Sequence, residues 1–326
     1  MAIILRILVS LAGLGIVAWV LRGIDLAETG KVLLEARLPY LGIGLLLVAT
    51  SLFVRTLRWG YMLAPCKSIS VGSLVGPLAV GYAIGNVTAT GIGALPRSLL
   101  ITRKEGVPTP YVLGTVLLEF VIDAAVVVTL AAVASFFVKL PPALAPVPYI
   151  LSLFALAIYL IILGFKRRRS LLAQFLPLHR LAPLVGRLPD EVRLGWQGFQ
   201  EGASAFLNNP GIFLRVALLT VCVWVVEGLL FWVLMLAVGM AASFPQGGVV
   251  MSFTHVVIGV PSLPGFVGTL DAAALTSLGT LGLDGARALS YTLIVHAYLI
   301  VPLTLVGALM AWREGIALTW RRADVP

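Results

Sequence analysis

Long apolar runs constrain this chain more than any other feature of its sequence. A helix of about 20 consecutive apolar residues is needed to cross the hydrocarbon core of a bilayer. Runs of that order occupy residues 2–21, 39–63, 108–138, 147–165, 211–240 and 287–312. The first run has no small-residue cleavage site before Arg22, which predicts a retained helix rather than a signal peptide. We therefore predict about six full transmembrane helices in an all-α polytopic membrane protein.

The composition points to the same class of protein. Of the 326 residues, 60% are apolar and 11% are charged, whereas soluble domains average roughly 45–50% and 25%. A water-soluble fold cannot bury so much apolar surface, so a soluble enzyme, a nucleic-acid-binding module and a disordered tail are excluded. The net charge is +9, but the basic residues concentrate where membrane topology places them. We expect no nucleic-acid partner.

Two further apolar stretches, residues 68–96 and 241–286, are broken by several glycines and prolines. Backbone polar groups freed by such breaks cannot face lipid, because each unpaired group costs several kcal/mol there. Basic residues mark the cytoplasmic side of a membrane protein, and here they place both termini in the cytoplasm. Both flanks of the first stretch then lie inside, and both flanks of the second lie outside. We predict two re-entrant helical hairpins that enter from opposite faces.

The two halves of the chain resemble each other. Residues 57–63 are similar to residues 230–236, and residues 91–95 are similar to residues 266–270. Three predicted crossings separate the two hairpins, and an odd number of crossings inverts the second copy. Inverted repeats with discontinuous elements near the midplane are typical of transporters.

These patterns predict a single membrane domain over residues 1–326. Its first pseudo-repeat covers residues 39–138, and its second covers residues 211–312. The connector at 166–210 is the least apolar part of the chain. We interpret it as amphipathic helices on the cytoplasmic surface, with a solvated linker as the alternative.

Several ionisable residues lie within or beside the apolar segments, where charges are expensive and normally face a bundle interior or a watery path. They are Arg55, Arg58, Glu119, Asp123, Glu227, His255, Asp271 and His296. Glu119 and Asp123 are four residues apart and share one helix face, which suggests a cationic partner or a shared proton. Arg55 and Arg58 lie three apart on the preceding long helix. The alternative for these residues is a static ion pair, and for His296 a structural histidine.

The tips of the two hairpins are the other candidate substrate-binding site. The first tip supplies Asn86, Gly91, Gly93 and Arg97, and the second supplies Pro264, Gly265, Gly268 and Asp271. Glycine permits a close approach of the backbone and positive φ angles. Exposed amides at the amino end of a broken helix favour an anion such as phosphate. We expect a lipid with an anionic or phosphate-containing headgroup, although tight turns that merely pack would have the same composition.

Signatures of catalysis are scarce. Three scattered histidines and two cysteines form no metal-ligand pattern, and the cysteines suggest no disulfide framework. No nucleophile elbow, P-loop or dinucleotide fingerprint is present. We expect no catalytic residue, no metal and no cofactor.

The sequence resembles the flippase-like transmembrane domain of lysylphosphatidylglycerol synthases, as a stand-alone member. The matching pieces are Leu57-Arg58-Trp59, Gly81-Tyr82, Asn86-Val87, Gly93 with Arg97, Glu105-Gly106, Glu119, Asp123, and Pro261-Ser262-Leu263-Pro264-Gly265 with Gly268. This resemblance implies an all-helical bundle with re-entrant helices and a role in moving lipids between leaflets.

The chain departs from the pattern of that family at several polar positions. Ala89, Gly91 and Ala94 stand where the first hairpin of the family usually carries polar residues, and Phe120 stands where an arginine usually follows Glu119. Where the second hairpin tends to carry a glutamate, this chain has Asp271 nearby. No aminoacyl-transferase domain is attached, so we expect no lipid aminoacylation by this chain alone.

We therefore predict a lipid transporter of the prokaryotic plasma or inner membrane that moves a phospholipid or a polyprenyl-phosphate-linked lipid between leaflets. One alternative is a non-transporting scaffold that binds a glycosyl- or aminoacyl-transferase in the membrane or cytoplasm. The other is a proton-coupled solute carrier. No ATP-binding motif is present, so active transport would use an ion gradient or the gradient of the lipid itself.

Overall fold

A computed structural model describes residues 25–88, 92–142, 145–153, 156, 209–259, 264–283 and 285–313. Within these ranges the regular structure is helical throughout, and no strand occurs. The elements are α2 (Leu26–Leu34), α3 (Leu38–Leu63), α4 (Val71–Val87), α5 (Ala94–Glu105), α6 (Thr109–Ser135), α11 (Pro210–Ala237), α12 (Phe244–Ile258), η1 (Pro264–Phe266), α13 (Thr269–Thr280) and α14 (Gly285–Arg313). The prediction of an all-helical fold is confirmed.

Four of these helices, α3, α6, α11 and α14, are long and apolar enough to span a membrane. They coincide with four of the six predicted runs. The predicted span at 2–21 lies outside the described residues, as does nearly all of the connector at 166–210. Of the predicted span at 147–165, residues 147–153 are helical, and most of the rest is outside the described part. The total of six spans stays a prediction.

The two broken stretches form two pairs of short helices. In the first pair α4 packs against α5, and in the second α12 packs against α13. Lys67, just before α4, donates a hydrogen bond from Nζ to the carbonyl oxygen of Glu105 at 2.7 Å. Arg287, in the first turn of α14 and soon after the end of α13, donates from Nη1 to the carbonyl oxygen of Gly239, which precedes α12, at 3.4 Å. The outer ends of each pair therefore meet, as expected of a hairpin.

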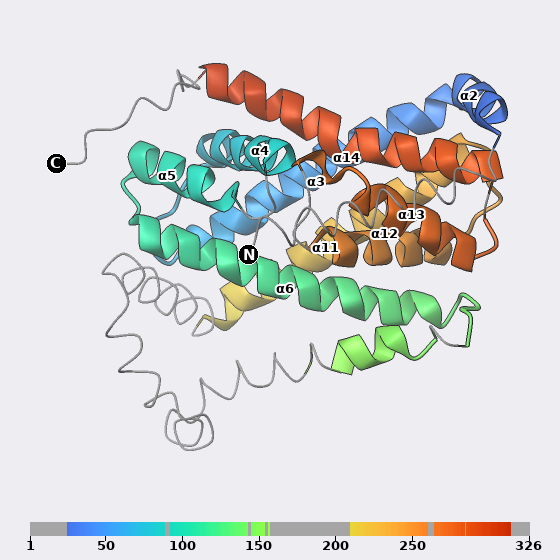
Figure 1. The fold of residues 1–326 in the computed structure, drawn as a ribbon. Helices are drawn as coiled ribbons and strands as arrows, with labels where there is room; N and C mark the ends of the chain where they lie inside the picture. The colour runs from blue at the N-terminus through green and yellow to red at the C-terminus, as the bar shows by residue number, and fades with distance from the viewer. Residues whose placement is uncertain are drawn as a thin grey trace, which may run out of the picture.

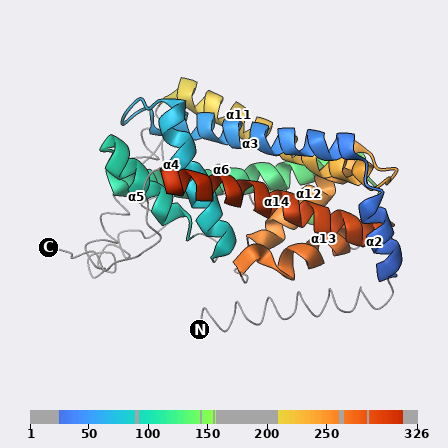
Figure 2. The ribbon, with the colours of Figure 1, turned by 90° about the horizontal axis from the view of Figure 1, so that it is seen from above.

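The two hairpins open at opposite ends of the bundle (Figures 1 and 2). The residue before α3, Arg37, donates its backbone N–H to the carbonyl oxygen of Ala237 at 2.9 Å, beside the outer ends of α12 and α13. The other end of α3, at Leu63, leads to Lys67 and the outer ends of α4 and α5. Since a helix rises about 1.5 Å per residue, these 26 residues separate the two openings by most of a bilayer thickness.

The first hairpin is longer than predicted. Its second helix continues to Glu105, whereas the sequence suggested an end at residue 96. The reason is that α5 carries Arg97, Arg103 and Lys104, so hydropathy falls before the helix ends. The second hairpin lies within its predicted range of 241–286.

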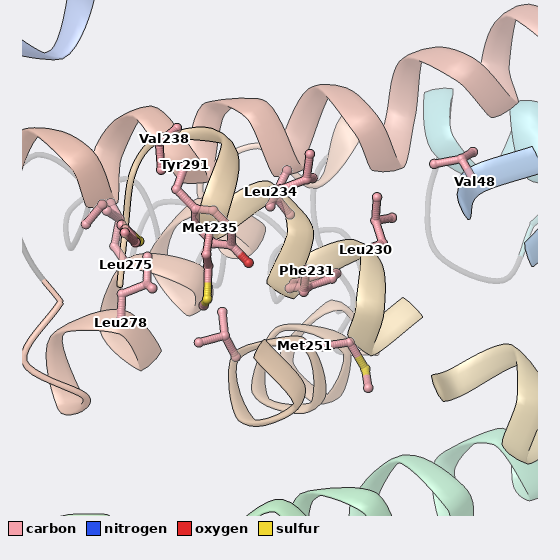
Figure 3. Close-up of a cluster of buried hydrophobic side chains, with 14 of the residues drawn as sticks. Val48, Leu230, Phe231, Leu234, Met235, Val238, Met251, Leu275, Leu278 and Tyr291 are labelled. Carbon is pink, nitrogen blue, oxygen red and sulfur yellow. The ribbon is translucent and has the colours of Figure 1, made fainter. Parts of the chain in front are cut away.

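Each hairpin has its own apolar core. Around α12 and α13, side chains from α3, α11 and α14 join a cluster that includes Phe231, Met251 and Tyr291 (Figure 3). Around α4 and α5, side chains from α3 and α6 join a second cluster that includes Trp59, Leu78 and Ile101. Between the two cores, α3 runs beside α11, and α14 packs against α4.

Glycine allows the two helices of the first hairpin to touch through their backbones. A Cβ atom on Gly93 would collide with the carbonyl oxygen of Gly81. Gly93 has an ordinary right-handed backbone, with φ of −60°, so its need for glycine comes from the close contact alone. The structure thus gives Gly93 a packing role.

The substitution Gly93→Ala should lower the free energy of unfolding by about 1–3 kcal/mol, the usual cost of overpacking. Gly85→Ala is the matched control in α4, because its new Cβ would meet nothing within 4 Å and helix propensity favours alanine by up to about 1 kcal/mol. Thermal unfolding of the two variants in detergent measures the difference. Equal midpoints would contradict the close contact.

Candidate functional site

A buried cluster of charged side chains lies where α3, α5 and α6 meet. Arg58 on α3 is 1% exposed. Its Nη2 donates to Glu119 Oε1 at 2.6 Å and to Asp123 Oδ2 at 3.0 Å. Its Nη1 donates to Asp123 Oδ1 and, at 3.3 Å, to Thr220 Oγ1 on α11. Glu119 and Asp123 are four residues apart on α6 and share one face of the helix. Both therefore bond the same guanidinium group.

A second arginine reaches the same acid from the first hairpin. Arg97 on α5 donates from Nη2 to Glu119 Oε2, so Glu119 bridges two arginines. The guanidinium carbon of Arg97 lies 4.6 Å from the centre of the Trp59 ring, a cation–π contact. The indole N–H of Trp59 in turn donates to Thr115 Oγ1 at 3.3 Å. Arg97 is therefore fixed on both α6 and α3.

A separate ion pair lies one helical turn along α3. Arg55 donates from Nη2 to Glu227 Oε1 on α11 at 3.1 Å and from Nη1 to the hydroxyl of Tyr82 on α4 at 3.3 Å. Ser51 accepts from Arg55 Nε at 3.2 Å and donates to Glu227 Oε1 at 2.7 Å. These bonds join α3, α4 and α11.

Trp224 on α11 links the two ion-paired groups. Its indole N–H donates to Asp123 Oδ1 at 2.9 Å, and its ring lies 5.2 Å from the guanidinium carbon of Arg55. We call the six ion-paired side chains the charged layer: Arg55, Arg58, Arg97, Glu119, Asp123 and Glu227.

The charged layer carries three positive and three negative groups. A buried charge is tolerated when an opposite charge and further hydrogen bonds compensate it, and each arginine here faces at least one carboxylate. For Glu119 and Asp123 the sequence left open a cationic partner or a shared proton, and the structure shows the cationic partner. An anion that binds these arginines must compete with the carboxylates.

A small cavity of about 20 Å³ borders the charged layer between α3, α4, α11 and α14. Its polar side is formed by Ser51, Arg55, Tyr82 and Glu227, and its other walls are leucine and valine side chains and Tyr298. The second carboxylate oxygen of Glu227 is buried and accepts no hydrogen bond within the described structure. The cavity has room for about one water molecule. Because of this lining, we call it the polar pocket.

The tip of the second hairpin carries a separate polar group. His296 on α14 contacts Asp271 Oδ1 through Nδ1 at 2.7 Å and the carbonyl oxygen of Gly265 through Nε2 at 2.9 Å. The backbone N–H of Gly268 donates to Asp271 Oδ2 at 3.1 Å. Four of the predicted site residues thus meet here. Pro264 lies beside them in η1.

The first hairpin and the second tip also contact the rest of the bundle. Asn86 on α4 donates from Nδ2 to the carbonyl oxygen of Ile300 at 3.3 Å and to Thr304 Oγ1 at 3.1 Å on α14. Helix α4 also contacts η1, so the first hairpin touches the tip of the second. Gly91 lies outside the described residues.

A sequence model of the transmembrane region of lysylphosphatidylglycerol synthases matches residues 3–307. The chain belongs to this family. The resemblance seen in the sequence is confirmed, and the protein is a multi-pass membrane protein of the flippase-like class. A comparison with curated proteins gives no match.

Sequence reasoning did not select every residue of this family member's polar interior. Ser51, Tyr82 and Trp224 form further hydrogen bonds with the charged layer, and Glu227 was noted only as one of the intramembrane charges. The spacing of three between Trp224 and Glu227 on α11 is a signal that could have identified both. In the part of the chain that the structure describes, no group of three or more His, Cys, Asp or Glu could hold a metal ion.

Glu119→Gln should lower the free energy of unfolding by about 3–5 kcal/mol, because the loss of one buried partner leaves a charge uncompensated. The control is Glu105→Gln, which breaks the ion pair with Lys67 at the open end of the first hairpin, where the side chain of Lys67 is 47% exposed. The control should leave the thermal midpoint nearly unchanged. Equal effects of the two substitutions, measured in detergent, would contradict a structural role for the charged layer.

Proposed function

We propose that this protein moves a lipid between the two leaflets of a prokaryotic plasma membrane, with α4–α5 and α12–α13 as re-entrant hairpins of an inverted repeat. The order of the helices supports the repeat. Helices of 26, 17, 12 and 27 residues (α3 to α6) are followed by helices of 28, 15, 12 and 29 residues (α11 to α14). Inverted repeats with broken helices that meet in the interior are typical of transporters.

The observation that carries the proposal is the polar pocket at the charged layer. It lies inside a bundle of apolar helices, beside the point where the first hairpin packs between α3 and α14. A lipid combines a polar headgroup with apolar chains, and the pocket combines Arg55 and Glu227 with walls such as Leu299 and Leu303. We infer that this pocket, which here has room for about one water molecule, widens during transport so that the headgroup passes its polar side and the chains follow its apolar walls.

The charge balance of the layer suggests how a phosphate headgroup would bind. Arg55 lines the cavity and is held by a single carboxylate, Glu227. Arginine binds phosphate through paired hydrogen bonds as well as it binds a carboxylate. A lipid phosphate would therefore replace Glu227 at Arg55, and Arg58 would stay bound to Glu119 and Asp123. Substrates of this kind are phospholipids and polyprenyl-phosphate-linked lipids.

The inverted arrangement predicts which flanks share a side of the membrane. With Cys222 replaced by serine, the exposed native Cys66, before the first hairpin, should react with a membrane-impermeant thiol reagent only from the cytoplasmic side. In a chain without native cysteines, the cysteine introduced by Ala241→Cys, before the second hairpin, should react only from the other side. Labelling of both sites from the same side of oriented vesicles would contradict the arrangement.

Reconstitution into liposomes with fluorescent phosphatidylglycerol tests the function itself. The wild-type protein should carry labelled lipid to the opposite leaflet. The double variant Arg55→Gln/Glu227→Gln removes both charges, so neither is left without its partner. It should fold, yet transport at least about tenfold more slowly, since a hydrogen bond to a charged group contributes roughly 1.5–3 kcal/mol.

The control for this assay is Arg215→Gln on α11. Arg215 is exposed and lies 5.4 Å from the ring of Tyr61, away from the cavity lining, so the variant should transport at the wild-type rate. Equal rates for the double variant and the wild type would remove the pocket from the lipid path. A wild-type protein that moves no lipid but co-purifies in fixed ratio with a transferase would favour the scaffold alternative.

A further inference from the structure

The imidazole ring of His296 lies between two hydrogen-bond acceptors. Its Nδ1 is 2.7 Å from Asp271 Oδ1, and its Nε2 is 2.9 Å from the carbonyl oxygen of Gly265. The side chains of His296 and Asp271 are 20% and 16% exposed, so the pair is mostly shielded from solvent. Such a ring is satisfied only when both contacts contain a proton.

The positions of these protons follow from the chemistry of the partners. A carbonyl oxygen only accepts, so Nε2 must carry a hydrogen. One more proton lies between Nδ1 and Oδ1, on either atom. In both placements the pair of His296 and Asp271 holds one proton more than a neutral imidazole beside an ionised carboxylate.

When the proton between His296 and Asp271 is lost, two hydrogen-bond acceptors face each other, whichever ring nitrogen of His296 keeps its hydrogen. If Nε2 keeps its hydrogen, a lone pair on Nδ1 faces the carboxylate of Asp271. If Nδ1 keeps it, a lone pair on Nε2 faces the carbonyl oxygen of Gly265. One contact must open, and each belongs to the second tip, because Asp271 also accepts from the backbone N–H of Gly268.

The backbone of the second tip depends on such contacts. Gly265 and Gly268 have φ of 73° and 81°, and Phe266 has φ of 55° although it is not a glycine. A left-handed backbone is unfavourable for a residue with a side chain and persists where the surroundings enforce it. Release of the tip from α14 would relax this strain, and η1 contacts α4 of the first hairpin.

Other charged groups near α14 are accounted for. Helix α4 carries no Asp, Glu, Lys, Arg or His, and its titratable group is Tyr82, which bonds Arg55. Arg55 and Arg58 of α3 and Glu227 of α11 are paired within the charged layer. Helix α2 contacts α14 near Ser290 and carries Glu28 and Lys31, with Asp25 and Glu35 at its ends, and α14 itself carries Arg287 and Arg313. Within the described structure, Asp271 is the acid that bonds His296.

We propose that His296 and Asp271 form a proton-binding site that holds the second tip against α14. With the proton bound the tip is closed, and when the proton leaves as pH rises, the tip is released. The site itself stands without the proposed function. Only its consequence, that proton binding regulates lipid movement by way of this tip, rests on that function.

The mobility of a spin label on the tip tests the site independently of transport. Val267 is 46% exposed and provides a position for a nitroxide, after Cys66 and Cys222 are replaced by serine and the cysteine introduced by Val267→Cys is labelled at one fixed pH. In liposomes examined by electron paramagnetic resonance between pH 5 and 9, the ratio of mobile to immobile label should rise by up to about tenfold per pH unit, as expected for one proton.

Two variants of the labelled chain give opposite expectations. In Asp271→Asn, the amide donates to Nδ1 and its oxygen still accepts from Gly268, while Nε2–H still donates to Gly265. Every bond is made without a titrating proton, so the label should be immobile at each pH. In His296→Gln one contact is missing at each pH, so the label should be mobile throughout. His255→Gln is the control, because the ring of His255 bonds the carbonyl oxygen of Met251, one turn back on its own helix, and not Asp271 or Gly265, so it should keep the wild-type profile.

A wild-type profile that does not change with pH would overturn the proposal, as would a wild-type profile in Asp271→Asn. A profile that titrates as expected in liposomes where the wild type moves no lipid would support the proton site and contradict the proposed function. Lipid transport by a protein in which the mobility of the label does not change with pH would support the proposed function and contradict the proton site.

Discussion

Glu119 accepts hydrogen bonds from two buried arginines that belong to different helices, and the packing of the first hairpin depends on this arrangement. Arg58 comes from α3 and Arg97 from α5, while Glu119 itself lies on α6. In a low-dielectric interior a charge without a partner is far more costly than a paired one. The position of α5 against α3 and α6 is therefore fixed by electrostatics as well as by its apolar side chains.

Much of this architecture can be read from local patterns in the sequence. A run of apolar residues reports a membrane helix because every backbone group is satisfied within it, and four predicted runs coincide with α3, α6, α11 and α14. Glycine and proline indicate the breaks, because they interrupt the helix that satisfies these backbone groups. An intramembrane charge is rare enough to mark the polar interior, which is how Arg55, Arg58, Glu119 and Asp123 were identified.

The partners of these charges could not be read in the same way, because they are distant in sequence. Arg58 and Glu119 are 61 residues apart, and Ser51 and Glu227 are 176 apart. Helical periodicity states that Glu119 and Asp123 share a face, but it does not state which cation that face meets. The end of α5 was missed for another reason. Its Arg97 pairs with Glu119 on another helix, so a local decline in hydropathy does not end the helix.

The two hairpins are held by different chemistry, although their helices are similar in length and order. The first is fixed by Arg97, and a guanidinium group keeps its charge at every accessible pH. The second is fixed to α14 by the pair of His296 and Asp271, and histidine is the side chain that changes charge near neutral pH. If the two hairpins are halves of an inverted repeat, the proton site proposed above would anchor the second half only while its proton is bound, whereas Arg97 anchors the first at every accessible pH. Only the second half would then respond to the proton concentration that it meets.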